Sequence, residues 1–465
     1  MSVVILLAAL GLLMFVAYRG YSVILFAPVC ALLAVLLTAP IDVAPAYTSI
    51  FMDKLAGFVK LYFPVFMLGA VFGKVIELSG FSKSIVAAVI RLVGAQRAML
   101  SIVLVCCILT YGGVSLFVVV FAVYPFAAEM FKQLNIPKRL IPGTIALGAF
   151  TVTMDALPGT PQIQNIIPTT FFQTNTWAAP WLGIVGSIFI LAVGMGYLEM
   201  RRRQAARAGE GYADKLVRLE NEPEPFGHER LPNAAIAILP LVLVFVLNYV
   251  FTQAIPGLYG TTYSFALGGA KPVPIEIGKV AAIWAVQAAL LIGILVTIAS
   301  AFRPVSARFA EGSKLAVAGA LLATLNTASE YGFGGVIASL PGFTLVASLL
   351  QSIPNPLINQ AITVTALAGI TGSASGGMSI ALAAMSESFI ANANAAGIPL
   401  EVMHRVASMA SGGMDTLPHN GAVITLLAVT GLTHRDSYRD IFVITLTKTA
   451  AVFVVIGFYY LTGIY

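Results

Sequence analysis

Charged residues are scarce in this chain. Asp, Glu, Lys and Arg make up only 10% of its 465 residues, whereas hydrophobic residues make up 59%. Soluble domains carry about 25% charged residues, so this composition excludes a soluble globular protein. Apolar runs of about 20 residues, the length of a membrane-spanning helix, recur along the sequence. We therefore expect a protein of the lipid bilayer.

Other absences narrow the function. The three cysteines, Cys30, Cys106 and Cys107, all lie in apolar runs, so we expect neither a disulfide framework nor a metal site. The sequence has no Walker A motif, which argues against transport driven directly by ATP. The net charge of +6 is modest and is typical of cytoplasmic loops of a membrane protein rather than of nucleic-acid binding. No cofactor and no catalytic residue are predicted.

The sequence does contain a long-range repeat. Residues 154–158 (MDALP) recur as residues 414–418 (MDTLP), and further matches occur in the same order at offsets of 260 to 264 residues. These matches pair 54–56 with 314–316, 72–76 with 333–337, 112–115 with 376–379, and 135–137 with 397–399. The sequence therefore predicts a duplicated unit, and each copy places a carboxylate beside a helix-breaking proline.

We expect the first repeat to cover residues 1–200 and the second to cover 231–465. The polar linker between them, 201–230, carries seven Lys and Arg residues, which places it in the cytoplasm by the positive-inside rule. The short basic loops expected at 303–314 and 434–439 belong on the same side. Five spans are predicted in each repeat, near 2–18, 21–38, 51–78, 140–175 and 177–200, and near 232–253, 275–301, 313–339, 401–433 and 438–463.

Each repeat also contains apolar pieces that are awkward as full spans. Residues 97–132 hold two short apolar arms around a Gly-Gly pair, with basic residues at both ends, and 357–396 also hold two arms around a tip with a Gly-Gly pair. We interpret both as re-entrant hairpins, each preceded by a surface helix, at 82–95 and 344–353. A hairpin enters and leaves on one side, so the second repeat is predicted to be inverted relative to the first. The expected fold is an all-α polytopic membrane protein with two inverted five-span units, each with a hairpin and a broken helix.

The hairpin tips and helix breaks predict a substrate site. Lipid offers no hydrogen bonds, so broken backbone is tolerated only where it faces protein or water. Helix starts at glycine-rich tips present N–H groups that attract carboxylates. The residues expected to bind substrate are Gly112, Gly113, Ser115, Thr160, Ser373, Ser375, Gly376, Gly377, Ser379, His419 and Asn420. Small residues for close helix packing are the alternative interpretation, but two Gly-Gly pairs in register favour a site.

Asp155 and Asp415 are the predicted ion-coupling residues. An intramembrane carboxylate is costly and is functional by default. Pro158 and Pro418 break the helices and free backbone carbonyls nearby. Each aspartate is suited either to bind Na⁺ with those carbonyls or to carry a proton if burial favours its neutral form. A capping role at the following half-helix is the alternative, and the two roles are compatible.

Several polar residues keep open interpretations. His419 replaces Gly159 of the first copy, and proton relay, anion binding and a structural hydrogen bond all suit it. Glu330 lies within a span without an acidic counterpart in the first copy, and pairing with a lysine is one role open to it. Lys60 fits a snorkelling side chain, and Glu387 has no assigned role. Three further histidines are expected in loops or at span ends and are assigned nothing: His228, His404 and His434.

A family resemblance follows from these residues. Residues 415–427 (DTLPHNGAVITLL), together with 431–438 (GLTHRDSY), resemble the C-terminal signature of the gluconate permease family, in particular its branch of 3-hydroxybutyrate and short organic-acid permeases. The likeness covers most of the chain. It implies a bacterial inner-membrane carrier of the ion transporter superfamily, with an elevator motion and a site lined by 112–115, 373–379, 155–160 and 415–420. Gluconate carriers couple to protons, whereas other superfamily branches use sodium.

We therefore expect a proton-coupled symporter of small organic acid anions, such as 3-hydroxybutyrate or gluconate, with elevator-type alternating access. The substrate carboxylate would lie between the hairpin tips. A Na⁺-coupled carboxylate symporter is the alternative. An intramembrane aspartyl protease is a distant one, because its two aspartates need distinct contexts whereas these are copies, and a channel would not need paired titratable residues. Analogy with elevator carriers suggests a homodimer.

Overall fold

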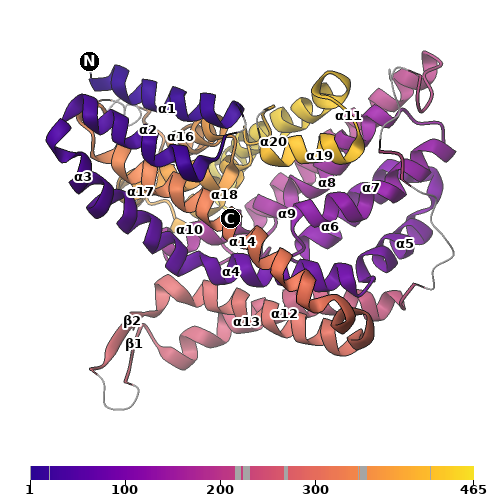
Figure 1. Ribbon diagram of the computed structural model, residues 1–465, viewed down its shortest axis with the longest axis horizontal. Helices are drawn as coiled ribbons and strands as arrows, with labels where there is room; N and C mark the ends of the chain where they lie inside the picture. The colour runs from indigo at the N-terminus through magenta and orange to yellow at the C-terminus, as the bar shows by residue number, and fades with distance from the viewer. Residues whose placement is uncertain are drawn as a thin grey trace.

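The long apolar runs of the sequence form helices, and glycine and proline mark where these helices stop. The computed structural model describes residues 2–19, 21–214, 221–223, 231–266, 271–343, 345, 353–418 and 420–465. Five of the described helical segments are long and apolar enough to cross a membrane. They are Pro40–Leu78, Pro180–Arg207, Ala234–Tyr259, Ile277–Ser300 and His434–Thr462. The chain is an all-α polytopic membrane protein (Figure 1).

The first half consists of a helical pair, a long helix, a short helix, a hairpin, a broken helix and a last long helix. The pair is α1 (Ser2–Tyr18) and α2 (Val23–Thr38), and the long segment joins η1 (Pro40–Asp42), α3 (Val43–Ala46), η2 (Tyr47–Phe51) and α4 (Met52–Leu78). Next come α5 (Phe81–Val93), η3 (Ala95–Arg97), α6 (Ala98–Tyr111) and α7 (Leu116–Gln133). The half ends with η4 (Lys138–Leu140), α8 (Ile141–Ala149), α9 (Val152–Asp155), α10 (Ile163–Phe172) and α11 (Pro180–Arg207).

Among the described residues, the second half repeats this order except for the short helix, and it has one addition. Its helices are α12 (Ala234–Tyr259), α13 (Ile277–Ser300), α14 (Phe302–Ser339), α16 (Pro356–Thr371), α17 (Ala374–Ala395), α18 (Leu400–Ser411), α19 (Gly421–Thr430) and α20 (His434–Thr462). The addition is an antiparallel ribbon of β1 (Thr262–Phe265) and β2 (Val273–Glu276), in which Thr262 pairs with Glu276. The sequence analysis did not anticipate this ribbon between α12 and α13.

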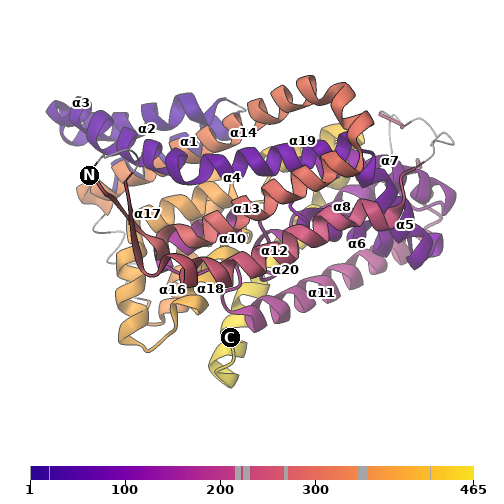
Figure 2. The ribbon, with the colours of Figure 1, turned by 90° about the horizontal axis from the view of Figure 1, so that it is seen from below.

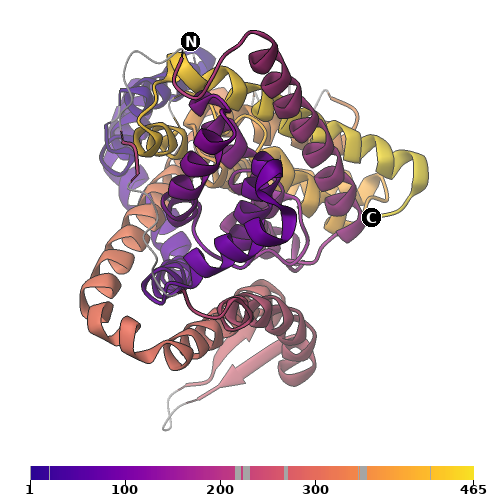
Figure 3. The ribbon, with the colours of Figure 1, turned by 90° about the vertical axis from the view of Figure 1, so that its right-hand side faces the viewer.

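The helices pack in pairs that cross between the two halves. α4 lies along α14, while α2 packs on α14 and α13 packs on α4. Likewise α10 contacts α17 and α19 contacts α7, and α11 packs along α20. Figure 2 shows α4, α13 and α12 side by side, and Figure 3 shows α12, α13 and the ribbon as a layer below the main body. Such exchanged partners are what a two-fold relation between repeats produces, and inverted topology stays a prediction.

Two segments expected as loops are helical instead. Residues 303–314 form the first turns of α14, and 434–439 form the start of α20. Pro304 lies in the first turn of α14, where a proline is tolerated because its missing N–H has no intrahelical partner. Thr433 and Asp436 form a capping box that starts α20. The predicted surface helix at 344–353 falls largely outside the described residues.

The inverted-repeat prediction has a direct test at the hairpin tips. Ser115 and Ser375 are half-buried residues beside the two Gly-Gly pairs. In a background without native cysteines, we expect Ser115→Cys to react with an impermeant thiol reagent added on the cytoplasmic side and Ser375→Cys with the reagent added outside. Labelling of both from the same side would contradict the inversion.

Candidate functional site

The first helix break lies between α9 and α10. Asp155 ends α9 and Pro158 follows it, and Gly159 takes a φ of 77° that favours glycine. The freed carbonyl oxygens are hydrogen-bonded. The Pro158 carbonyl accepts from the Tyr111 hydroxyl at 2.7 Å, the Gly159 carbonyl from Asn248 Nδ2 at 2.9 Å, and the Thr160 carbonyl from Asn165 Nδ2 at 3.0 Å. The break is thus fixed by the first hairpin and by α12.

The second break lies between α18 and α19. Asn420 begins α19 by accepting hydrogen bonds from the backbone N–H groups of Ala422 at 2.7 Å and Val423 at 3.0 Å. Its Nδ2 also donates to the Gly372 carbonyl at 2.7 Å. Gly372 is the residue between the two arms of the second hairpin, so Asn420 ties the break to the hairpin tip. His419, predicted as a substrate ligand, lies outside the described residues.

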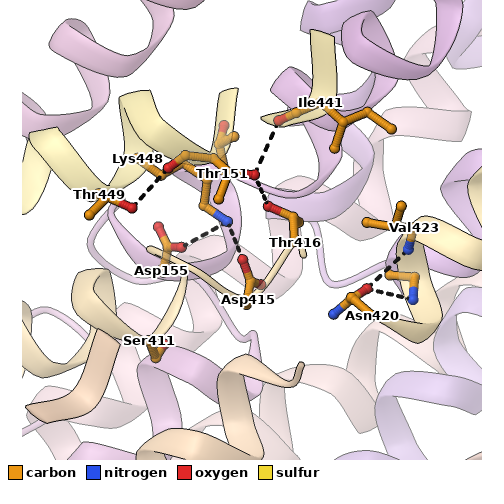
Figure 4. A network of polar contacts seen from close by, with 12 residues as sticks. Thr151, Asp155, Ser411, Asp415, Thr416, Asn420, Val423, Ile441, Lys448 and Thr449 are labelled. Atoms are coloured by element: carbon orange, nitrogen blue, oxygen red, sulfur yellow. Dashed lines mark hydrogen bonds and ion pairs between the residues drawn. The ribbon is translucent and has the colours of Figure 1, made fainter. Parts of the chain in front are cut away.

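The two breaks converge on one lysine of α20. Lys448 Nζ lies 2.9 Å from Asp415 Oδ1 and 4.0 Å from Asp155 Oδ2 (Figure 4). All three residues are buried, with exposed fractions of 2% for Lys448, 2% for Asp155 and 4% for Asp415. Asp415 forms a close ion pair with Lys448, whereas the distance from Lys448 to Asp155 is at the upper limit for an ion pair. Two carboxyl groups share one ammonium, so the cluster carries a surplus negative charge unless a proton or cation joins it.

The cluster is continued by hydroxyl groups on the Asp415 side. The Thr416 hydroxyl hydrogen-bonds the Thr445 hydroxyl, one turn before Lys448 on α20. The Thr416 carbonyl accepts from the Tyr438 hydroxyl at 3.2 Å. Both contacts attach the second break to α20, which therefore positions the lysine and the aspartate together.

Asp155 is seated by residues of the second half. A Cβ added to Gly412 would come within 1.8 Å of Asp155 Oδ2, so only glycine leaves room for this carboxyl group. Ser408 Oγ donates to the Asp155 carbonyl at 2.7 Å. The fully buried Arg405 donates to the same carbonyl at 3.3 Å and to the Ala178 carbonyl at 2.8 Å. α18 therefore anchors the end of α9.

The predicted tip residues occupy different surroundings. A Cβ added to Gly112 would lie 2.4 Å from Leu241 of α12, and one added to Gly377 would lie 2.2 Å from the Ala368 backbone of α16. These two glycines permit close helix packing, as the alternative interpretation stated. Gly113 has a φ of 95° and makes the turn of the first tip. Gly376 faces Glu330 of α14.

The hydroxyl residues of the site also differ in their contacts. Ser373 Oγ accepts from the Gly376 N–H at 3.1 Å and caps α17. Ser375 Oγ lies 3.3 Å from Thr327 Oγ1, and Thr160 Oγ1 donates to the Thr153 carbonyl at 2.5 Å. Ser379 Oγ is buried without a hydrogen-bond partner. Ser115 precedes α7 but makes no side-chain cap bond.

Lys448 and Arg405 were not predicted from the sequence to belong to the site. Lys448 is a lysine in an apolar stretch, and the rule that an intramembrane charge is functional by default applies to it as it did to Asp155. Arg405 lies within the predicted span 401–433 and was assigned no role. His404, assigned nothing from sequence, is fully buried beside it and hydrogen-bonds Thr174 Oγ1 at 2.6 Å. Among the described residues there is no group of three or more His, Cys, Asp or Glu side chains that could hold a metal ion.

YxjC of Bacillus subtilis (strain 168), an uncharacterised transporter, is 60% identical over the full length of both chains. The crystal structure of the YdaH transporter of Alcanivorax borkumensis, described as having an unusual topology, matches with a TM-score of 0.50 and 15% identity, covering 92% of this chain and 90% of that one. This second likeness concerns the fold alone. No protein-family profile matches the chain.

Lys448 provides the stability test of the site. Lys448→Met leaves two buried carboxyl groups without their cation, so we expect a loss of about 3–5 kcal/mol of stability, seen as a lower melting temperature in detergent. Adding Asp415→Asn should restore much of the loss. Lys74→Met is the matched control, because Lys74 pairs with the exposed Glu77; its expected cost is under about 1 kcal/mol. A Lys448→Met variant as stable as the parent would contradict the ion cluster.

Proposed function

The chain belongs to the transporter family of YxjC, and we propose that it is a proton-coupled symporter of small organic acid anions, such as 3-hydroxybutyrate or gluconate. It is a membrane transporter and not an enzyme. The observation that carries the proposal is the placement of Lys448 between Asp155 and Asp415, one from each broken helix. The resemblance of residues 415–427 to gluconate permeases supports the substrate class and a place in the bacterial inner membrane.

The surplus charge of the cluster is the basis for coupling. Lys448 pairs closely with Asp415 at 2.9 Å and lies 4.0 Å from Asp155, while Arg405 binds the backbone carbonyl of Asp155 rather than its carboxyl group. Asp155 is therefore the less compensated of the two carboxyl groups. An uncompensated charge in a low-dielectric interior is strongly disfavoured, so Asp155 takes up a proton when it is sealed from water. Proton binding makes the cluster neutral, and proton release requires access to water. Asp155 is therefore the proposed proton carrier and Asp415 its fixed neighbour.

The backbone around the first break favours a proton over sodium. A Na⁺ site would draw on the carbonyls freed by the break. Those of Pro158, Gly159 and Thr160 already accept hydrogen bonds from Tyr111, Asn248 and Asn165. Sodium would have to share these carbonyl oxygens with their donors, whereas a proton needs only the carboxyl group.

The substrate anion is proposed to bind next to the cluster, near the starts of the half-helices. α19 begins at Gly421 and α17 at Ala374, and Asn420 joins these two starts through Gly372. Helix N-termini carry partial positive charge and favour a carboxylate. Protonation of Asp155 removes the negative charge that would repel the substrate, which links proton binding to anion binding.

Movement is proposed to be of the elevator type. The helices α1, α2, α4, α12, α13 and α14 pack largely on one another, while the hairpins, breaks, α11 and α20 form a second group. The second group carries the ion cluster as one body. By analogy with elevator carriers we propose a homodimer, in which the first group forms the fixed frame.

The protease alternative does not suit this geometry. Aspartyl proteases use two carboxyl groups that share a proton at close range. Here an ammonium group lies between the two aspartates and binds one of them at 2.9 Å. The arrangement supports charge compensation during transport rather than activation of a water molecule.

The two aspartates are expected to give different transport defects. Asp155→Asn imitates the protonated acid, so accumulation driven by a pH gradient should fall at least about tenfold while exchange of labelled for unlabelled substrate persists. Asp415→Asn removes the partner of Lys448 and should abolish concentrative uptake. Asp42→Asn, at an exposed position on η1, serves as control. Normal accumulation by Asp415→Asn would remove it from the coupling site.

The coupling ion is tested in proteoliposomes with imposed gradients. A panel of radiolabelled organic acids should show uptake of small hydroxy monocarboxylates that stops when the pH gradient is collapsed. Removing sodium should have no effect. Uptake that requires sodium and ignores the pH gradient would assign Na⁺ as the coupling ion, and uptake of none of the acids would reject the substrate class.

A further inference from the structure

Glu330 of α14 is a buried carboxyl group that the coupling cluster does not use. Its exposed fraction is 4%, and Oε2 has no hydrogen-bond partner among the described residues. Ser373 of the hairpin tip lies near the carboxyl group. The lysine partner considered from sequence is not found: within the part of the chain that the structure describes, Glu330 forms no ion pair. A carboxyl group buried in this way is tolerated when it is neutral, because an unpaired buried charge is far more costly.

The tip of the second hairpin is shaped around this carboxyl group. A Cβ added to Gly376 would come within 1.7 Å of Glu330 Oε2 and 2.3 Å of its Cδ. One turn earlier on α14, Thr327 Oγ1 lies 3.3 Å from Ser375 Oγ. Ser373, which lies near Glu330, caps the Gly376 N–H. The polar face of α14 and the start of α17 therefore meet at Glu330.

The charges around α14 leave Glu330 uncompensated. On α4, Lys54 Nζ lies over the Tyr331 ring at 5.8 Å from its centre, and its stem packs against Gly335, more than a turn beyond Glu330. Asp53 and Lys60 are exposed. The remaining charged residues on helices packed against α14 are engaged elsewhere or exposed: Lys74 with Glu77, Lys279 with Glu276, and Glu387 at the surface.

We propose that Glu330 is a second proton-binding site, which holds the tip of the second hairpin against α14 when protonated and releases it when ionised. Ionisation breaks the carboxyl O–H bond and passes the proton to water. The carboxylate left behind then requires hydration, which it gains only if the tip of α17 moves away from α14. The tip is joined to the second break through Gly372 and Asn420. Release of Glu330 therefore loosens the region that carries Asp415.

This contact is specific to one hairpin. The match of 72–76 with 333–337 aligns Glu330 with Gly69 of α4, which has no side chain to titrate. Only the second hairpin then has a proton-sensitive contact with the long helix of its repeat. The two sides of the carrier would thus differ in how pH governs their opening. This transport role rests on the proposed function, whereas the contact itself does not.

Cross-linking between the two helices tests the contact without any substrate. Thr327→Cys and Ser375→Cys place two thiols where two hydroxyl oxygens are 3.3 Å apart, in a background with Cys30, Cys106 and Cys107 replaced. With Glu330 present, we expect the cross-linking yield to fall at least about threefold between about pH 6 and about pH 9, relative to the same pair with Glu330→Gln. The Gln background corrects for the pH dependence of thiol reactivity. Equal pH profiles in the two backgrounds would overturn the proposal.

Transport provides a second readout that does not need the cysteine pair. Glu330→Gln imitates the protonated acid, so exchange of labelled 3-hydroxybutyrate should stay within about twofold of the parent while accumulation driven by a pH gradient falls at least about tenfold. Glu387→Gln, exposed on α17, is the matched control and should leave both unchanged. Full accumulation by Glu330→Gln would overturn the coupling role. If the parent protein transports no organic acid, the proposed function fails, and cross-linking still decides whether Glu330 controls the contact.

Discussion

Lys448 is the residue on which the arrangement of the two broken helices depends. Each break has a buried aspartate, and neither carboxylate is stable in a low-dielectric interior without a counter-charge. α20 supplies one ammonium group, 2.9 Å from Asp415 and 4.0 Å from Asp155. This shared cation draws together two segments that lie 260 residues apart in the sequence. It also leaves one carboxyl group of the cluster in excess, and this excess is the basis of the proposed proton coupling.

The remaining polar contacts hold the broken backbone in place around that cluster. Breaking a helix in a membrane protein exposes carbonyl groups that lipid does not satisfy. In the first break they accept hydrogen bonds from Tyr111, Asn248 and Asn165. In the second, Asn420 caps α19 and reaches the hairpin tip at Gly372. The breaks are therefore held by side chains from other elements, among them Tyr111 of the first hairpin.

The duplicated pattern predicted the order of helices, both breaks and both aspartates, because helix-breaking prolines and buried carboxylates are visible in a sequence. It did not predict Lys448 or Arg405. In the first copy their positions hold Ile188 and Ile145, so comparing the repeats hid them. The contact between Glu330 and Gly376 was not predicted either, because the two residues meet only through packing between helices. Residues 303–314 were predicted to be a loop because they carry charged residues. They are helical, and these charges belong to the surface of the helix.

The proposed binding of a proton by the surplus carboxyl group, that of Asp155, links the ion cluster to the proposed transport. The most direct measurement is infrared difference spectroscopy of the purified protein in lipid as the pH is raised from about 5 to about 9, a range that covers titration of buried carboxyl groups. The account predicts a protonated-carboxyl band that disappears in Asp155→Asn and remains in Glu330→Gln. A spectrum in which Asp155→Asn removes no carboxyl band would show that Asp155 stays ionised throughout and would contradict the account.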